Sequence, residues 1–500
     1  MTGPLLQVVF RDRSRSAGPH GPVPVGGFAS CRAVGRLARL LSLGGLLVAM
    51  SAGLAVAQEV PAHLQAAAPP SAEHFREQRD RLREAIGEGI VVMRGSAQAM
   101  HMGQFGQDQD FYWLSGVSQP QVAMLLGPAT DDQPALDELL VPPYSPFTAM
   151  WDGAGLAPGE KTAEQTGFVE ARNSRGLHRR LDALLAPNDE GERPVLWVRR
   201  KPFVPPGGTP GHSESVTTAQ NRDRFDGRPS RDEAFYEALE ERYPEVEIRD
   251  VTPVLHRLRA RKTAVEIALL RESTEIAAEG LVEVMRCARP GLYEYQLAAI
   301  ARYVFSLRGA GPDAYAAIVG AGANGCILHY KENSAQLQDG DLIVMDYAAT
   351  LHGYASDVTR TFPANGKFTA AQRKLVEDVY DVQQELIRNV RPGASLSQLT
   401  RLCSKLLIEK GYRSDHGPSH HVGLAVHDPS TDRLEPGMVL TVEPGAYLRQ
   451  EGMGCRIEDV VLVTEDGHEV LSAMVPSKPD EIERLMAEKG VVEIPVGVAR

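Results

Sequence analysis

Cysteine is scarce in this chain, and the few cysteines present are widely separated. None of them has the CxxC spacing of a thiolate zinc site; the five cysteines among the 500 residues are Cys31, Cys287, Cys326, Cys403 and Cys455. This count and spacing argue against both a thiolate zinc site and a disulfide scaffold. We therefore expect these cysteines to be buried thiols.

An excess of positive charge is also missing, because the net charge is −12 at pH 7. This balance argues against nucleic acid, or an anionic membrane surface, as the main partner. Internal repeats are not apparent, and the residues after the leader contain no low-complexity tract. The content of 43 % hydrophobic and 24 % charged residues is normal for a soluble globular protein. A chain of 500 residues allows two or three domains.

The N-terminal leader has the features of an export signal. Residues 1–30 are rich in Gly, Pro, Arg and Ser, and basic residues from Arg32 to Arg39 precede an apolar run, Leu40 to Ala57. The run ends in an A-x-A site, so we expect cleavage after Ala57 and a periplasmic or secreted protein without a membrane span. An uncleaved anchor is the alternative, although the run is at the short edge for a span. The true translation start stays open.

The remaining chain predicts two domains joined to the signal by a linker at 58–70. A smaller α/β domain is expected at 71–251, with a helix from Ser71 and four strands near Gly89–Met93, Val122–Leu126, Leu139–Val141 and Val195–Val198. Within this domain, Gln104–Gly116 changes from polar to aromatic residues and predicts a loop that enters a strand. Pro202–Arg231 predicts a long surface loop, because it is rich in Pro, Gly, Ser and Arg.

The second domain is expected at 252–480, followed by a tail at 481–500. Its helices alternate with strands and hairpins, which predicts an α+β domain. The predicted helical regions are Val254–Arg286, Gln296–Leu307, Thr369–Val390 and Ser395–Lys410.

One stretch of this second domain suggests chemistry. The apolar run from Leu342 ends in Asp346, and Asp357 precedes a second β-rich run after a turn at Thr350–Gly353. This pattern predicts a hairpin that can bring the two carboxylates side by side. Adjacent buried like charges need a compensating cation, and hard divalent metals prefer oxygen ligands. Two solvated aspartates on an exposed hairpin are the alternative for this stretch alone.

Three more metal ligands follow in strand or loop contexts: His420, Glu443 and Glu458. Together with the two aspartates they form a set of four carboxylates and one imidazole, which can hold two divalent ions. Ligand hardness favours Mn²⁺ and leaves Co²⁺ or Zn²⁺ as alternatives. Such ions lower the pKa of bound water and polarise a carbonyl oxygen, which is hydrolytic chemistry. Histidines near these segments can donate to an oxyanion or move protons: His329, His416 and His427.

The order of the motifs ILHY, MDYAATLHGYASDVTRTFP, HGPSHHVGLAVHD, VEPGAY and RIEDV resembles the pita-bread metallopeptidases, and most closely the Xaa-Pro aminopeptidase (aminopeptidase P) family. The resemblance covers about residues 254–475, and QDQDFYWLSG extends it weakly into the first domain. It implies a pita-bread catalytic domain with metal ligands at Asp346, Asp357, His420, Glu443 and Glu458. It also implies substrate-binding and proton-shuttling histidines at His329, His416 and His427, and a supporting arginine at Arg456.

Within this resemblance we expect Glu443 to move the proton from the attacking water to the leaving proline nitrogen. Three neighbours of the motifs are expected to have structural roles. Arg360 is expected to form an ion pair, Asp459 to support the ligands from behind, and His421 to be a packing or surface residue.

The expected function is removal of the N-terminal residue from peptides with proline in second position. Xaa-Pro dipeptidase (prolidase) activity on the same fold is the first alternative. Methionine aminopeptidase fits a large N-terminal domain poorly, and creatine amidinohydrolase does not need the metal set. A catalytically inactive binding module is a remote alternative, because such proteins usually lose ligands. The resemblance also implies a homodimer or homotetramer to which the N-terminal domains contribute.

Overall fold

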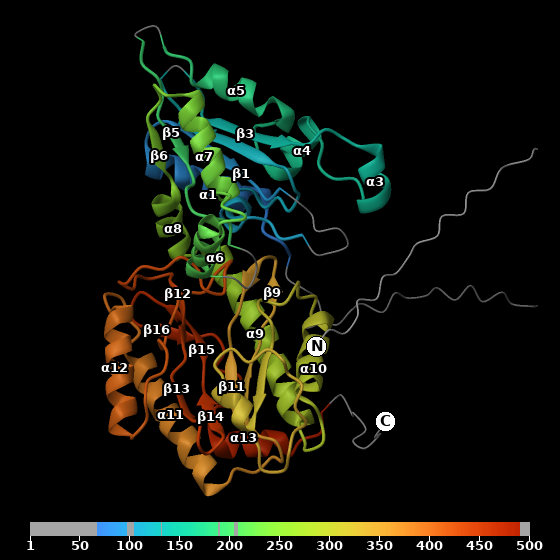
Figure 1. Ribbon diagram of the computed structural model, residues 1–500, viewed down its shortest axis with the longest axis vertical. Coiled ribbons are helices and arrows are strands. Elements are labelled where there is room, and N and C mark those ends of the chain that lie inside the picture. The colour runs from blue at the N-terminus through green and yellow to red at the C-terminus, as the bar shows by residue number, and fades with distance from the viewer. Residues whose placement is uncertain (1–67, 98–104, 132, 189–190, 205–208, 491–500) are drawn as a thin grey trace, which may run out of the picture. The chain divides into compact units, whose positions relative to one another are not determined.

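The computed structural model describes residues 68–97, 105–131, 133–188, 191–204 and 209–490 (Figure 1). The predicted leader and signal, and most of the predicted linker, lie outside these residues, so the export signal stays a prediction. Among the helices of the described residues, none combines the length and the apolar character that a membrane crossing needs.

The N-terminal domain is built on a six-stranded sheet with the order β4-β3-β2-β1-β5-β6. The central strand β1 pairs antiparallel with β2 and parallel with β5, so the sheet is mixed. Its strands are β1 (Ile90–Arg94), β2 (Ala123–Gly127), β3 (Leu136–Val141), β4 (Glu170–Asn173), β5 (Leu196–Val198) and β6 (Ile248–Asp250). The four predicted strands are present, and the short, mostly polar strands β4 and β6 were not predicted.

Helices cover both faces of this sheet. Successive side chains of a strand point to opposite faces, so alternate residues of β1 contact different helices. Ile90 and Val92 pack in one cluster with residues of α5 and α7, whereas Val91 and Met93 pack in another with residues of α1, α2 and α8 (Thr252–Ala260). The helices of this domain are α1 (Ala72–Ile86), α2 (Gln109–Ser115), α3 (Pro146–Asp152), α4 (Glu160–Thr166), α5 (Leu177–Leu184), α6 (Pro210–Arg222) and α7 (Arg231–Arg242).

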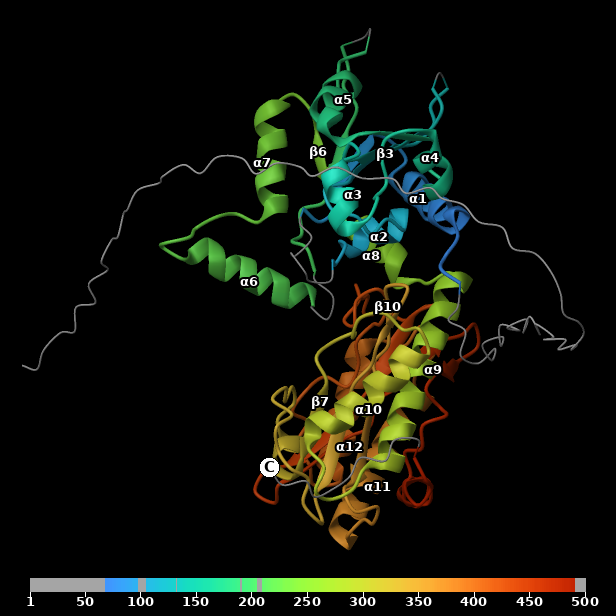
Figure 2. The ribbon, with the colours of Figure 1, turned by 90° about the vertical axis from the view of Figure 1, so that its right-hand side faces the viewer.

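Two segments predicted as loops contain helices, and those two predictions are wrong. Gln104–Gly116 includes α2, which begins because the Asp108 side chain accepts a hydrogen bond from the Phe111 backbone N–H and ends at Gly116 in the left-handed conformation. Pro202–Arg231 includes α6, whose first residue follows the capping side chain of Thr209. Figure 2 shows α6 beside α7 at the side of the domain.

The catalytic domain has small buried sheets between two layers of helices (Figure 1). Alternate residues of β15 separate into two core clusters, one packed with α9 and α10 and the other with α11 and α12. The strands are β7 (Ile318–Ala321), β8 (Leu342–Asp346), β9 (Thr350–Leu351), β10 (Tyr354–Ala355), β11 (Thr359–Pro363), β12 (Val439–Val442), β13 (Gly445–Leu448), β14 (Met453–Arg456), β15 (Asp459–Val463) and β16 (His468–Val470). The helices are α8 (Thr252–Ala260), α9 (Ala264–Cys287), α10 (Glu294–Leu307), α11 (Ala370–Arg388), α12 (Leu396–Glu409) and α13 (Pro479–Met486).

The predicted helical region Val254–Arg286 is divided into α8 and α9. The break occurs at Thr263, whose side chain caps α9 in a reciprocal capping box with Glu266. The predicted tail at 481–500 is also corrected, because it contains most of α13. Ile482 of that helix is 1 % exposed and belongs to the same core cluster as α9.

One core cluster is continuous across the two domains. It contains Leu82 of α1 and Trp113 of α2, together with Leu281 of α9 and Phe305 of α10. The four cysteines of the described residues are buried and unbridged, as predicted.

Candidate metal centre

The predicted hairpin is confirmed, and it places the two aspartates together. Strand β8 pairs antiparallel with β11, with Asp346 opposite Thr359, so Asp357 lies just before the paired region. The hydroxyl of the half-buried Tyr315 donates to Oδ1 of Asp346 at 2.5 Å and lies 2.6 Å from Oδ1 of Asp357. One phenol therefore joins both carboxylates.

The three other predicted ligands approach the same point from the second half of the domain. Segment 418–422 runs beside β12, with hydrogen bonds from the Thr441 N–H to the His420 carbonyl and from the Glu443 N–H to the Pro418 carbonyl. His420 Nε2 lies 3.4 Å from Oδ2 of Asp357 and 3.4 Å from Oε1 of Glu443. Asp357, His420 and Glu458 each offer a ligand atom within 4.8 Å of the other two.

Arg456 and Thr359 support this group from behind. Arg456, which is 4 % exposed, donates from Nη2 to Oδ2 of Asp346 at 2.7 Å and from Nε to Oγ1 of Thr359 at 3.3 Å. The Thr359 hydroxyl in turn donates to Oε2 of Glu458 at 2.6 Å. Both aspartates and Glu458 are thus oriented by donors that leave further oxygen lone pairs free for a metal.

The electrostatics of the group show that negative charge is under-compensated. Burial and the nearby Asp346 carboxylate raise the pKa of Asp357 well above its ordinary value, and burial and Asp357 do the same for Glu458. Burial and the charge of Glu458 raise the pKa of Glu443 to about 8. Four carboxylates share the charge of Arg456, so additional positive charge would stabilise their ionised forms.

This donor set fits a pair of hard divalent cations. Carboxylate oxygens predominate, one imidazole nitrogen faces two of them, and the separations of 3.4 Å from His420 Nε2 exceed ordinary hydrogen-bond lengths. Oxygen-rich sets with one imidazole suit Mn²⁺, Co²⁺ or Zn²⁺. The residues Asp346, Asp357, His420, Glu443 and Glu458 would hold the ions.

The three predicted histidines lie around this group in different ways. The imidazole of His427 stacks on that of His420 with ring centroids 3.7 Å apart, and burial lowers the pKa of His427 to about 3. His329 is exposed, and a positive charge on it lowers the pKa values of both His416 and His427, so it lies near these two imidazoles. A neutral imidazole can donate one N–H to substrate.

His416 has both ring nitrogens engaged. Its Nδ1 lies 2.8 Å from the Gly417 carbonyl oxygen, so Nδ1 carries the proton and donates. Arg456 Nη1 donates to the Tyr447 hydroxyl at 3.0 Å, which leaves that hydroxyl to donate to Nε2 of His416 at 3.0 Å. His416 is therefore fixed as a neutral imidazole beside the ligands.

Two of the three neighbours fit their expected structural roles. The buried Arg360 forms the expected ion pair with Asp459 at 2.6 Å. The Asp459 carboxylate accepts from Arg360, Gln383 and Ser472 and makes no hydrogen bond to a metal ligand among the described residues, so its support of the ligands stays a prediction. His421 is fully buried.

Comparison with known proteins places the chain in a family. Residues 268–465 match metallopeptidase family M24, and residues 75–192 match the aminopeptidase P N-terminal domain. The Xaa-Pro aminopeptidase of Haemophilus influenzae is 31 % identical over 416 residues, which cover 76 % of this chain and 88 % of that protein. The chain belongs to the Xaa-Pro aminopeptidase (aminopeptidase P) family.

Two further relatives of the aminopeptidase P family agree with this. The Xaa-Pro aminopeptidase of Escherichia coli is 42 % identical over 271 residues, which cover 47 % of this chain and only 62 % of that enzyme. A zinc-substituted E. coli aminopeptidase P in complex with product superimposes with a TM-score of 0.70 at 29 % identity, over 84 % of this chain and 99 % of that one. The predicted family and the predicted fold, with its smaller α/β domain before a pita-bread domain, are confirmed.

Tyr315 is the main functional candidate that the sequence did not reveal. It lies in the segment before β7, far from either aspartate in sequence, and no local pattern marks a tyrosine whose partners are so distant. An alignment of relatives could have marked it, whereas spacing could not.

We expect Tyr315→Phe to weaken metal binding while the fold is kept. The change removes only the hydroxyl that joins Asp346 and Asp357, and loss of such a supporting donor costs about 10–100-fold in metal affinity. Titration with Mn²⁺ followed by calorimetry measures the affinity. Tyr303→Phe, at an exposed position of α10, is the matched control. Unchanged affinity in Tyr315→Phe would contradict the role assigned to this hydroxyl.

Metal-free protein should lose stability as the pH rises from about 5 to about 8. The pKa of Glu443 is about 8 in the folded state against 4.5 in the unfolded state, so its contribution is complete below 4.5 and is lost as the pH passes through 8. Asp357 and Glu458 shift in the same direction. Bound metal requires the deprotonated ligands and reverses the trend. The difference in Tm between metal-loaded and chelator-treated protein should therefore grow with pH, and a constant difference would refute this.

Proposed function

We propose that this protein is a dinuclear metal-dependent exopeptidase that hydrolyses the N-terminal Xaa-Pro bond of peptides. One observation carries the proposal: four carboxylates and His420 converge in a buried, under-compensated cluster with neutral histidines directly beside it. The family membership supports aminopeptidase chemistry, and the names of the relatives support proline in the second position of the substrate.

The bound ions would activate a water molecule and polarise the scissile carbonyl. Mn²⁺ is the proposed native metal, because the donor set is rich in hard oxygen ligands. Proton transfer and hydrogen-bond donation to the substrate are assigned to side chains of the protein.

Glu443 is the proposed proton carrier. Its carboxylate lies at the end of β12, with Oε1 3.4 Å from Nε2 of His420. It would accept a proton from the attacking water at one Oε atom and return it to the proline nitrogen as the bond breaks.

His427 and His329 are the proposed donors to the substrate carbonyl oxygen. His427 is held neutral, so its ring can donate an N–H without first acquiring a charge. His427 stacks on the ligand His420, and His329 lies near His427, beside the place where charge would develop on the carbonyl oxygen during attack. His416 is placed further out, on the proline side. Its two ring nitrogens are engaged by Gly417 and Tyr447, so we do not assign it as a donor to the carbonyl oxygen.

The proposed assembly is a homodimer or homotetramer to which the N-terminal domain contributes. Helix α3 supports this, because it buries none of its residues and exposes large apolar side chains: Phe147 is 71 %, Met150 71 % and Trp151 69 % exposed.

The proposed location is the periplasm or the medium, because the sequence predicts an export signal that ends at Ala57. Native mass spectrometry of secreted protein reports both the subunit number and the mature N-terminus, and a cytosolic monomer would contradict both proposals.

The activity is tested with Arg-Pro-Pro and with an Xaa-Pro dipeptide in parallel. We expect release of free arginine from the tripeptide, loss of activity with chelator and best recovery with Mn²⁺. Cleavage of the dipeptide alone would replace the proposal by a dipeptidase. Normal metal binding without turnover of either peptide would point to an inactive binding module.

His427→Ala should lower kcat about 10²–10³-fold with little change in KM, because a donor to the developing oxyanion is lost. Metal content should stay normal, since His427 is not among the ligands. Kinetics on Arg-Pro-Pro and elemental analysis of the same preparation test both statements. Loss of metal from this variant would make His427 a ligand or ligand support.

A further inference from the structure

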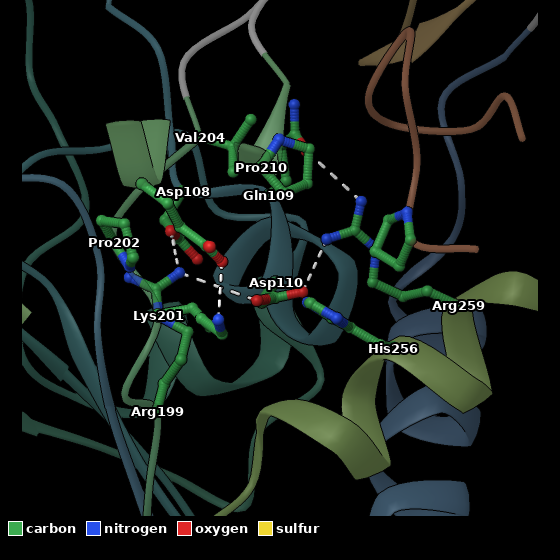
Figure 3. Close-up of a pocket in the computed structure, with 12 residues that line it drawn as sticks. Asp108, Gln109, Asp110, Arg199, Lys201, Pro202, Val204, Pro210, His256 and Arg259 are labelled. Carbon is green, nitrogen blue, oxygen red and sulfur yellow. Dashed lines mark hydrogen bonds and ion pairs between the residues drawn. The ribbon is translucent and has the colours of Figure 1, made fainter. Parts of the chain in front are cut away.

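A chain of buried ion pairs connects helix α2 of the N-terminal domain to the catalytic domain. Figure 3 shows its part around Asp108, Asp110, Arg199 and Arg259. Arg259 of α8 lies at its centre and is 4 % exposed. It donates from Nη1 to Oδ1 of Asp110 at 2.6 Å and from Nη2 to Oδ1 of Asp428 at 2.5 Å. On the far side, Arg199 pairs with Asp108 and lies 3.7 Å from Asp110. The guanidinium of Arg259 is thus shared between the two domains.

This network is not a substrate site. The cavity that it lines has a volume of about 30 Å³, which is room for about two water molecules. Its aspartates and arginines are already paired with one another. We therefore ask which segment of the backbone these paired residues hold in position.

Asp428 holds the loop that carries His427. Its Oδ1 accepts a hydrogen bond from the Ala425 backbone N–H at 3.1 Å, and its own N–H donates to the His421 carbonyl at 2.9 Å. The loop closes tightly around this carboxylate, because a Cβ added at Gly423 would lie 2.4 Å from Oδ2 of Asp428. Lys262 also donates to Oδ2 at 3.1 Å.

The same loop is attached to both halves of the metal centre. The Val422 N–H donates to the Val439 carbonyl at the start of β12, and the Ala355 N–H of β10 donates to the Gly423 carbonyl. With its N-terminal end fixed by strands and its interior filled by Asp428, the loop presents His427 stacked on His420. A shift of Asp428 would therefore move the ring of His427.

We propose that Arg259 is a positioning residue, which clamps Asp428 against Asp110 and thereby makes the orientation of His427 depend on the N-terminal domain. This inference rests on the proposed function, since it assigns a rate effect to His427. Arg259 touches neither the metal ligands nor the substrate region, so it acts only through the loop. Misplacement of a reacting group by about 1 Å can cost on the order of 10²-fold in rate.

Two variants of the full-length, metal-loaded protein test the clamp. Arg259→Gln removes the shared cation and leaves Lys262 to compensate Asp428. Asp110→Ala removes only the contact on the N-terminal domain and leaves Arg259 paired with Asp428, so it carries the test if the first variant does not fold. Each should lower kcat on Arg-Pro-Pro by about 10–100-fold, with KM and metal content unchanged.

Trp113→Phe is the matched control. Trp113 also lies on α2, and its indole N–H makes a buried interdomain hydrogen bond to Oε1 of Glu266 at 3.0 Å rather than to the ion pairs around Arg259. This variant should lower Tm yet keep kcat within about twofold of wild type. An equal fall in kcat would show a general effect of domain docking and would overturn the proposal.

The deciding measurement is made in the His427→Ala background. If Arg259 acts through His427, adding Arg259→Gln or Asp110→Ala should change the residual kcat by less than about twofold. A second fall of the same size as in wild type would overturn the proposal.

Imidazole NMR signals of protein loaded with diamagnetic Zn²⁺ provide a readout that does not need turnover. The signal of His427, assigned by its loss in His427→Ala, should move in Arg259→Gln and stay in place in Trp113→Phe. An unmoved signal would overturn the proposal even in an inactive protein. Absence of turnover in wild type, by contrast, would refute the proposed function and leave this test of the clamp valid.

Discussion

The repulsion among buried carboxylates is the constraint on which the catalytic domain depends. Asp346, Asp357 and Glu458 are each less than 10 % exposed, and burial raises the pKa values of Asp357 and Glu458 well above their ordinary values. The protein supplies one arginine, one phenol and one threonine hydroxyl to orient them, and these donors do not balance the charge. The site is therefore organised for cations before any cation is bound, and the stability of its ligand geometry is coupled to the metal.

The strands and helices around the site hold those ligands in an interior that is shielded from solvent. Strands β8, β11, β12 and β15 are buried along their whole length, and helices pack on both faces of the sheets. The four carboxylate ligands sit at or next to the ends of these strands, so the ladders fix their backbone while their side chains reach the shared space. His420 lies in the segment that is hydrogen-bonded beside β12. Antiparallel pairing also explains why ligands far apart in sequence meet.

Much of this could be predicted from the sequence, because the ligands lie at the ends of strongly apolar runs. The hairpin around Asp346 and Asp357 followed from two such runs and the turn between them. Helix α2 could not be predicted, since a short aromatic segment has no clear period and its start depends on a cap at Asp108. Tyr315 and Arg259 were equally hidden. Their roles come from partners brought close by the fold, and single-residue patterns do not record distant contacts.

Glu266 shows what this arrangement means for the independence of the two domains. It caps its own helix α9, and the same carboxylate accepts from Trp113 and Gln78 of the N-terminal domain and lies 3.1 Å from the hydroxyl of Tyr354 near the metal hairpin. The Glu266 side chain therefore stabilises three features at once. These are the first turn of α9, the contact between the two domains and the hairpin that carries Tyr354. A catalytic half released from its partner domain would expose an apolar face and leave this carboxylate with fewer donors. The two segments that match separate family models therefore do not form two independently folding domains in this chain.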